Sequence, residues 1–205
     1  MRHYFLIVET KMPLSTPVPR KPAHTRVVTC HGFQREDDLW DIEGRIVDTK
    51  PYGFANKDRG GRIEAGEALH DMSIRLTINS DLEVIDAEAV IDASPYNYCK
   101  CVTAVAKNLI GLSIAPGWSN KSKTAMGKNR GCTHLTELLG PIATTAIQTM
   151  ASERIKREHE SRKHQQGDRK GYKSAFIDTC HALAATSPVV KMHWPDQYQS
   201  DESTR

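Results

Sequence analysis

The strongest constraint on the fold is an alternation of side chains that runs from His70 to Ile78. Apolar residues occupy every second position, with polar residues between them: Met72, Ile74, Leu76 and Ile78 against Asp71, Ser73, Arg75 and Thr77. A period of two is typical of a strand with one buried face, and His70 lies in phase with the apolar side. A turn signal over 79–81 then predicts a hairpin whose second strand covers 82–91. Its inward side is predicted to consist of Ile85, Ala87, Ala89 and Ile91.

Two more strands and two helices follow from similar patterns. Residues 27–30 and 39–48 have the β-branched or alternating character of strands. Residues 99–110 and 135–150 repeat apolar side chains at helical spacing, which predicts two helices with one apolar stripe each. Pro141 within the second pattern indicates a kink or a break into two helices. The fold class is therefore α+β: an antiparallel sheet of about four strands with helices packed on one face.

The chain is predicted to contain one main domain with extensions. Residues 1–25 form an extended N-terminal arm, because prolines near its end fix φ and remove hydrogen-bond donors. Residues 26–153 form the core α+β domain. Residues 154–173 are highly charged and poor in apolar side chains, which predicts a solvated helical extension or a partly disordered linker. Residues 174–205 are predicted to pack on the core and to end in a disordered tail.

Composition excludes several classes of protein. The 205 residues are 39% hydrophobic, enough for one core, and the net charge of +3 is too small to predict nucleic-acid binding. No segment approaches the roughly 18–20 apolar residues of a membrane span. The apolar run at 4–8 is short and no small-residue cleavage site follows it, so a secretory signal is not expected. Five cysteines, an odd number, predict a reducing, cytoplasmic setting with free or metal-bound thiols.

The run GCTHLTELL carries the strongest sign of chemistry. Its Cys132, His134 and Glu137 lie where a glycine-containing loop gives way to a predicted helix. A thiol, an imidazole and a carboxylate are good ligands for borderline divalent metals. His70 and Cys99 also stand at the ends of predicted elements, and such ends can converge in space on a rigid scaffold. We predict that His70, Cys99 and Cys132 bind one metal ion.

His134 and Glu137 have a different predicted role. They lie one turn apart on the predicted helix, so we interpret them as catalytic acid–base groups or as groups that support the ligands. The loop at 113–131 is predicted to close over the site, with Trp118 excluding water. Each site residue also has an ordinary interpretation, as a buried thiol, a hydrogen-bonded histidine or a surface carboxylate. Asp48 and Lys50, at a strand end, are interpreted as a surface ion pair rather than as substrate contacts.

Several stretches of the sequence carry a resemblance to a known family. They include HTRVVTCHGFQREDDLWDIEGRIVDTK, EALHDMSIRLTI and GCTHLTELLGPIATTAIQT, and they run through most of residues 20–195. With these motifs the chain resembles the bacterial family called domain of unknown function 2889. Asp37-Asp38 stands where that family usually has Asp-Gly. Members of the family often occur beside genes for aromatic-acid breakdown.

Residues 66–150 also resemble, more remotely, the iron–sulfur scaffold proteins of the IscU type. In the order of elements, His70, Cys99 and Cys132 take the positions of the three scaffold cysteines. His70 replaces the first thiol, and Gly131 stands where the scaffold has a histidine. The resemblance implies the scaffold fold and a shared site more than it implies cluster assembly.

The predicted function is that of a metal-dependent enzyme of small-molecule catabolism, with an aromatic or acyl substrate. Thiolate and imidazole ligands favour zinc or iron over magnesium or calcium, and an iron–sulfur cluster is the less favoured cofactor. Two alternatives stay open. One is a non-catalytic iron–sulfur or zinc carrier whose charged helix docks a protein partner, and the other is a protein with a structural zinc site. A second copy of the chain is a further partner that the sequence leaves open.

Overall fold

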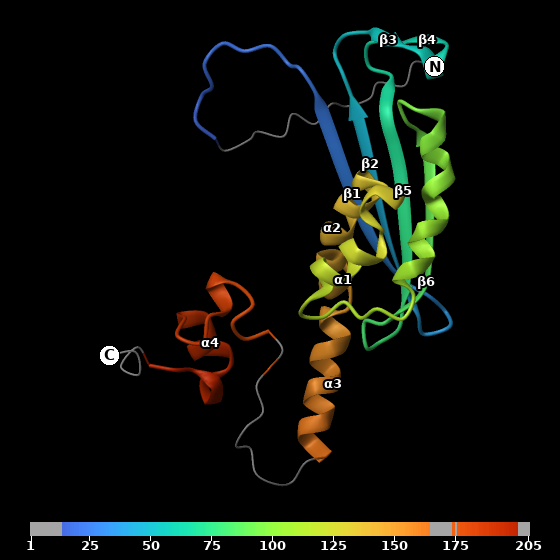
Figure 1. Cartoon of the computed structure of the whole chain (residues 1–205). Coiled ribbons are helices and arrows are strands. Elements are labelled where there is room, and N and C mark those ends of the chain that lie inside the picture. Colours follow the sequence, from blue (N-terminus) through green and yellow to red (C-terminus); the bar gives the residue numbers. More distant parts are fainter. Residues whose placement is uncertain (1–13, 165–173, 175, 201–205) are drawn as a thin grey trace, which may run out of the picture. The chain divides into compact units, whose positions relative to one another are not determined.

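The computed structural model describes residues 14–164, 174 and 176–200, and it divides the chain into two compact units, Met1–Ile147 and Gln148–Arg205 (Figure 1). The centre of the first unit is a four-stranded antiparallel sheet in the order β1-β2-β5-β6. Its strands are β1 (Thr25–Gln34), β2 (Trp40–Thr49), β5 (Ala68–Ile78) and β6 (Val84–Ala93). With helices packed against this sheet, the predicted α+β class is confirmed.

The buried face of the sheet follows the predicted alternation. In β5 the four apolar residues in phase with His70 are all at most 2% exposed: Met72, Ile74, Leu76 and Ile78. In β2 the same face carries Trp40, Ile42, Gly44, Ile46 and Asp48, all buried. Most alternate positions of both strands face solvent, where Arg45 pairs with Asp71 and Arg75 with Glu88, whereas Thr77 is buried and donates a hydrogen bond to Asp41. An antiparallel sheet with one covered and one wet face produces this pattern.

Helices cover the buried face. They are the 3₁₀ helix η2 (Asn97–Leu109), α1 (Trp118–Ala125), the short 3₁₀ turn η3 (Lys128–Arg130) and α2 (Thr133–Thr149). The apolar stripe of α2 supplies six buried residues, among them Leu135, Leu138 and Ile142. The helix continues through Pro141 and ends at Thr149, so it is not broken at the proline. In the described part of the chain, no helix is long and apolar enough to cross a membrane.

The loops hold elements that the sequence patterns did not reveal. The predicted loop after β2 contains a small hairpin of β3 (Phe54–Asn56) and β4 (Gly61–Ile63), joined by the 3₁₀ turn η1 (Lys57–Arg59). The predicted lid at 113–131 contains α1, and Trp118 is 6% exposed with its indole N–H donated to the Leu139 carbonyl at 3.0 Å. Trp118 is therefore a core residue. The predicted closing of the 113–131 segment over the site stays a prediction.

The inward side of β6 differs from the predicted one because of a β-bulge. The register places Thr77 opposite Asp86 and Ile78 opposite Val84, so one extra residue, Ile85, falls between the two pairs. A bulge of this kind shifts the alternation by one position. Val84 is consequently buried, and Ile85, which we had predicted to face inward, is 43% exposed.

The turn between β1 and β2 uses a backbone conformation that favours glycine. Asp38 has φ of 61°, in the left-handed region. Asp38 stands where the family that the chain resembles usually has glycine. The Arg35 amide donates to the Leu39 carbonyl at 2.9 Å and closes the turn, so the aspartate is accommodated there.

The second unit is described by itself. It contains α3 (Ala151–His164), the 3₁₀ turns η4 (His181–Leu183) and η5 (Pro195–Gln197), and α4 (Pro188–His193). Ile177, Ala185 and Val190 form a small buried cluster there. α3 covers the first part of the predicted charged extension, and the rest of it, 165–173, lies outside the described residues. The predicted packing of 174–205 on the core stays a prediction.

A glycine on the core face of β2 lets α2 approach the sheet. A Cβ atom built on Gly44 would lie 2.7 Å from the Cδ1 atom of Ile142, a fully buried side chain of α2. We expect Gly44→Ala to lower the free energy of unfolding in urea by about 1–3 kcal/mol, because the added methyl overpacks this contact. The matched variant is Gly140→Ala, whose Cβ would meet nothing within 4 Å. A loss in Gly44→Ala no larger than in Gly140→Ala contradicts the packing argument.

Candidate metal centre

Strand register brings three polar side chains into one row at the end of the sheet. Arg26 of β1 lies opposite Asp48 of β2, and Asp48 lies opposite His70 of β5. Directly opposed residues have Cβ atoms about 4.5–5.5 Å apart, so long side chains in such a row interact. The same alternation that builds the apolar core therefore ends in a charged row.

Asp48 is the centre of this row. Its side chain is 1% exposed, and both of its oxygens accept hydrogen bonds. Arg26 donates from Nε to Oδ1 at 2.7 Å and from Nη2 to Oδ2 at 2.8 Å, a bidentate pair. His70 Nδ1 lies 2.9 Å from Oδ2, and His24 Nε2 lies 3.1 Å from Oδ1. The buried carboxylate is thus surrounded by nitrogen atoms from β1, β5 and the segment before β1.

These contacts decide the charge of the carboxylate. Burial alone raises the pKa of Asp48, but hydrogen bonds from Arg26 and His70 outweigh burial and hold the pKa well below its usual range. The hydrogen bond to Asp48 raises the pKa of Arg26 in turn. Asp48 is therefore ionised and can only accept, so the ring nitrogen Nδ1 of His70 carries the hydrogen of their bond.

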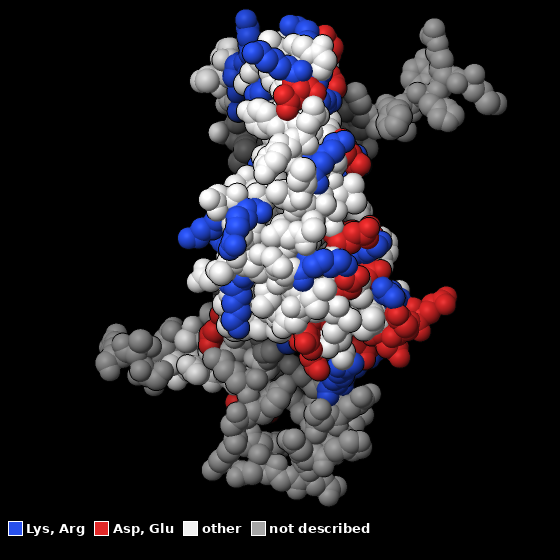
Figure 2. Space-filling model, turned by 45° about the vertical axis from the view of Figure 1, so that its right-hand side comes forward, with Lys and Arg blue, Asp and Glu red and all other residues white. Residues whose placement is uncertain are grey.

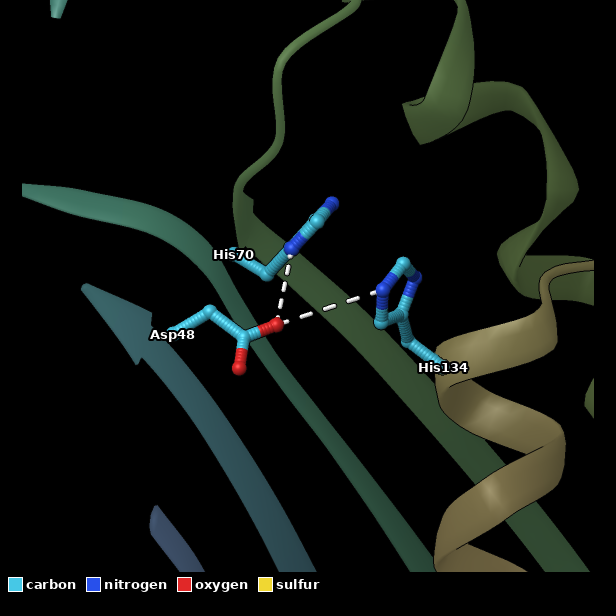
Figure 3. A group of neighbouring side chains, drawn as sticks. All are labelled: Asp48, His70 and His134. Atoms are coloured by element: carbon cyan, nitrogen blue, oxygen red, sulfur yellow. Dashed lines mark hydrogen bonds and ion pairs between the residues drawn. The ribbon is translucent and has the colours of Figure 1, made fainter. Parts of the chain in front are cut away.

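His134 of α2 completes the group from above the sheet. Its Nε2 lies 3.9 Å from Asp48 Oδ2, the same oxygen that His70 contacts, and Figure 3 shows both imidazoles turned toward it. The two rings lie with their centroids 3.8 Å apart and tilted by 33°. Burial lowers the pKa of both histidines, and for His134 the neighbouring His70 adds to that effect. Lowered pKa values keep the imidazoles neutral, the form that binds metals.

The spacing of these atoms suits one small cation. One ligand atom from each of Asp48, His70 and His134 lies within 4.8 Å of the other two. Zinc–ligand bonds of about 2.0–2.1 Å in a tetrahedral site place ligand atoms roughly 3.3 Å apart. The separations of 2.9 and 3.9 Å at Asp48 Oδ2 lie on either side of that value. Two histidines and one carboxylate are also a ligand set of catalytic zinc and of non-haem iron.

The predicted thiols stand beside this group. Cys132 Sγ lies 4.0 Å from Nδ1 of His134 and 3.6 Å from the sulfur of Met72. Cys99 lines the same pocket as His70, Cys132 and His134. Among the described residues, the group with converging ligand atoms does not include either thiol. The combination of His70, Cys99 and Cys132 as one ligand set therefore stays a prediction.

Glu137 interacts with the row from its outer side. Its carboxylate accepts a hydrogen bond from Nη1 of Arg26 at 2.5 Å, and its side chain is 56% exposed. Arg26 therefore bridges Glu137 on α2 and Asp48 on β2. This contact supports the orientation of Arg26, and the predicted catalytic role of Glu137 stays a prediction.

A pocket of about 390 Å³ adjoins the candidate metal-binding group. His70, His134, Cys99 and Cys132 line it together with Tyr96 and Lys128. Both imidazoles thus have one side toward Asp48 and belong to the wall of a cavity large enough for a small molecule.

Asp48 is the member of the group that our sequence interpretation missed. The sequence pattern predicts a surface ion pair of Asp48 with Lys50, and this prediction is wrong, because Asp48 is buried and paired with Arg26. A usable signal was present, because Asp48 is in phase with Trp40, Ile42 and Ile46 on the core face of its strand. A carboxylate in phase with buried residues needs a partner, which marks it as a site residue.

The family of the chain follows from comparison with family models. The model described as Protein of unknown function (DUF2889) matches residues 24–148. The chain belongs to the DUF2889 family. In this DUF2889 protein the matched range contains the three candidate metal ligands Asp48, His70 and His134, and both pocket thiols. No curated protein and no solved structure matches the chain, so the resemblance to IscU-type scaffolds stays a prediction.

We expect the buried pair of Arg26 and Asp48 to stabilise the fold more than an exposed ion pair of the same geometry does. In Arg26→Met the buried carboxylate loses two hydrogen bonds, so we expect the free energy of unfolding to fall by about 1–3 kcal/mol. Arg45 and Asp71 form a bidentate pair of the same geometry, at 2.7 and 2.6 Å, on the wet face. Arg45→Met should cost less than about 1 kcal/mol. If urea unfolding shows the same loss of free energy in both variants, the buried pair stabilises the fold no more than the exposed pair does.

The lowered pKa values of His70 and His134 predict how stability depends on pH in the metal-free protein. The unfolded chain has histidine pKa values near 6.5, above those of the folded chain, so it binds more protons as the pH falls below about 6.5. Stability should therefore decrease on acidification, by up to about 1.4 kcal/mol per pH unit for each imidazole. Urea unfolding of chelator-treated protein at pH 8 and pH 5.5 measures this. His134→Gln should reduce the dependence, and an unchanged dependence contradicts the assignment.

Proposed function

We propose that this protein is a metal-dependent enzyme that binds zinc or iron(II) through Asp48, His70 and His134. The observation that carries the proposal is the convergence of three ligand atoms within 4.8 Å at the edge of a pocket. Three protein ligands leave a coordination position for water or substrate, as catalytic sites require. A metal held there supplies Lewis-acid chemistry, which polarises a carbonyl group or acidifies a bound water.

The surroundings support the site as a metal centre. Ligands of catalytic metals are usually held by a second set of hydrogen bonds, and here Arg26 holds Asp48 while Cys132 lies against the second nitrogen of His134. The β-strands that carry Asp48 and His70 are rigid elements of the main sheet. A site built on strands and a helix keeps its geometry better than a site on loops.

The pocket supports a small-molecule substrate. Its volume of about 390 Å³ lies in the range of small-ligand sites. Tyr96, Pro95 and Val102 give the wall an apolar and aromatic character. We infer that an aromatic or acyl compound enters beside the metal. We place this activity in a reducing, cytoplasmic setting, which the odd number of cysteines in the sequence favours.

A non-catalytic carrier of zinc or of an iron–sulfur cluster is the second proposal. The two thiols of Cys99 and Cys132 on the pocket wall favour it, because thiolates are the usual ligands of clusters. The ligand sets differ between the two functions. The enzyme needs Asp48, His70 and His134, whereas the carrier needs the thiols, so substitution of individual ligands separates them.

The metal prediction is tested with protein purified without a tag and without oxygen. Elemental analysis should find about one equivalent of zinc or iron, and removal of the metal with a chelator should lower the melting temperature. His134→Gln and Asp48→Asn should reduce the bound metal at least tenfold, because each leaves only two ligands. Cys99→Ser should keep the full equivalent. His31→Gln, a histidine of β1 outside the group, is the matched control for folding and metal content.

Two results contradict the proposal. A protein that keeps its metal in both His134→Gln and Asp48→Asn does not use this group. Loss of the metal in Cys99→Ser or Cys132→Ser, with an absorption band near 400 nm in the parent, assigns the site to a cluster carrier instead.

A further inference from the structure

The segment that forms the pocket wall has an unusual distribution of charge. Between Asp92 and Glu137 the sequence contains six lysines or arginines and no acidic residue. The six are Lys100, Lys107, Lys121, Lys123, Lys128 and Arg130. In the described part of the chain only Lys107 of these forms an ion pair, with Asp86. On the face shown in Figure 2, red side chains gather toward the lower right, and the charged side chains along the left-hand margin are mostly blue.

Lys128 is the member of this set that lines the pocket. Its backbone is held in a tight turn between Gly127, with φ of 79°, and Gly131. The Arg130 amide donates to the Gly127 carbonyl at 2.8 Å, and the Gly131 amide donates to the Lys128 carbonyl at 3.2 Å. A Cβ atom on Gly131 would lie 1.7 Å from the Met126 carbonyl oxygen, so only glycine permits this close approach. The ammonium group is therefore attached to a fixed backbone at the pocket.

The pocket has no negative charge to balance Lys128. Among the described residues that line it, none is acidic, and the buried charge of Asp48 is already paired with Arg26. Asn129 adds an amide and Thr133 a hydroxyl to the same wall. Met72, Pro95 and Val102 add apolar surface to the wall, and Tyr96 and Tyr98 add aromatic rings. A cavity with an uncompensated cation and apolar walls favours an anion that has an apolar body.

We propose that this pocket binds a small carboxylate with an apolar body of about one ring, and that Lys128 selects the carboxylate. The inference rests on the proposed metal centre and deepens it, since a divalent ion beside His70 and His134 adds positive charge to the same wall. Two cationic groups on the wall of one cavity favour a carboxylate over a neutral amide of the same shape, because only the carboxylate gains a charge-assisted hydrogen bond.

The probes are benzoate and benzamide, which have the same shape and differ in charge. Both are titrated by calorimetry into the zinc-loaded full chain and into the metal-free chain. With cobalt(II) in place of zinc, the visible spectrum reports changes at the metal. We expect benzoate to bind the loaded protein at least tenfold more tightly than benzamide and to change the cobalt spectrum. Lys128→Gln should weaken benzoate binding at least fivefold and leave benzamide binding unchanged.

Two further variants control for folding and for general charge. Lys128→Arg keeps the charge and should retain benzoate binding within about threefold. Lys123→Gln removes an exposed lysine of α1 that does not line the pocket, and it should bind benzoate as the parent does. Metal content is measured in every variant, so a lost metal is recognised separately from a lost ligand.

The outcomes separate this inference from the proposed function. Equal binding of benzoate and benzamide, or full benzoate affinity in Lys128→Gln, by protein with one equivalent of metal overturns the carboxylate site and leaves the metal centre standing. The opposite result is a protein that binds no metal but still binds benzoate in a way that depends on Lys128. That result supports the carboxylate site and overturns the metal centre.

Discussion

The buried negative charge of Asp48 is the interaction on which the rest of the site depends. An ionised carboxylate removed from water is very costly unless charged or hydrogen-bonding partners replace the water. Arg26 supplies two such bonds and His70 supplies a third, and these residues come from the two strands on either side of β2. The register of three strands is therefore fixed by one charge as well as by the apolar core, because a shift by one residue would expose the core face and break these bonds.

Different partners of Asp48 orient its carboxylate and share its oxygen Oδ2. Arg26 approaches both oxygens and fixes the plane of the carboxylate, while Oδ2 also faces the two imidazoles. A cation entering the group would replace the hydrogen bond between His70 and Oδ2 and leave the bidentate pair with Arg26 in place. Glu137 holds Arg26 from the far side. A ligand that is oriented in advance by a second set of residues loses little entropy when it binds, which favours binding.

The sequence predicted the fold better than the site, and the reason is physical. Alternation in β5 and the helical stripe of α2 report burial directly, so the sheet and its covering helices were predictable. The bulge at Ile85 was not, because it depends on the local pairing of two strands. His70 and His134 were found as reactive residues, yet Asp48 was read as surface charge. Which side chains meet depends on register across strands far apart in sequence, and the pattern of any one segment does not contain that information.

The candidate metal ligands and the residues of the pocket wall also come largely from different elements of the fold. Asp48 and its arginine lie on the sheet, whereas Lys128 and both thiols lie on the pocket wall formed by η2, η3 and the start of α2. His70 and His134 belong to both sets. Because the turn at Gly131 and the sheet are built by different interactions, a change in the wall can alter ligand choice without disturbing the charge balance around Asp48.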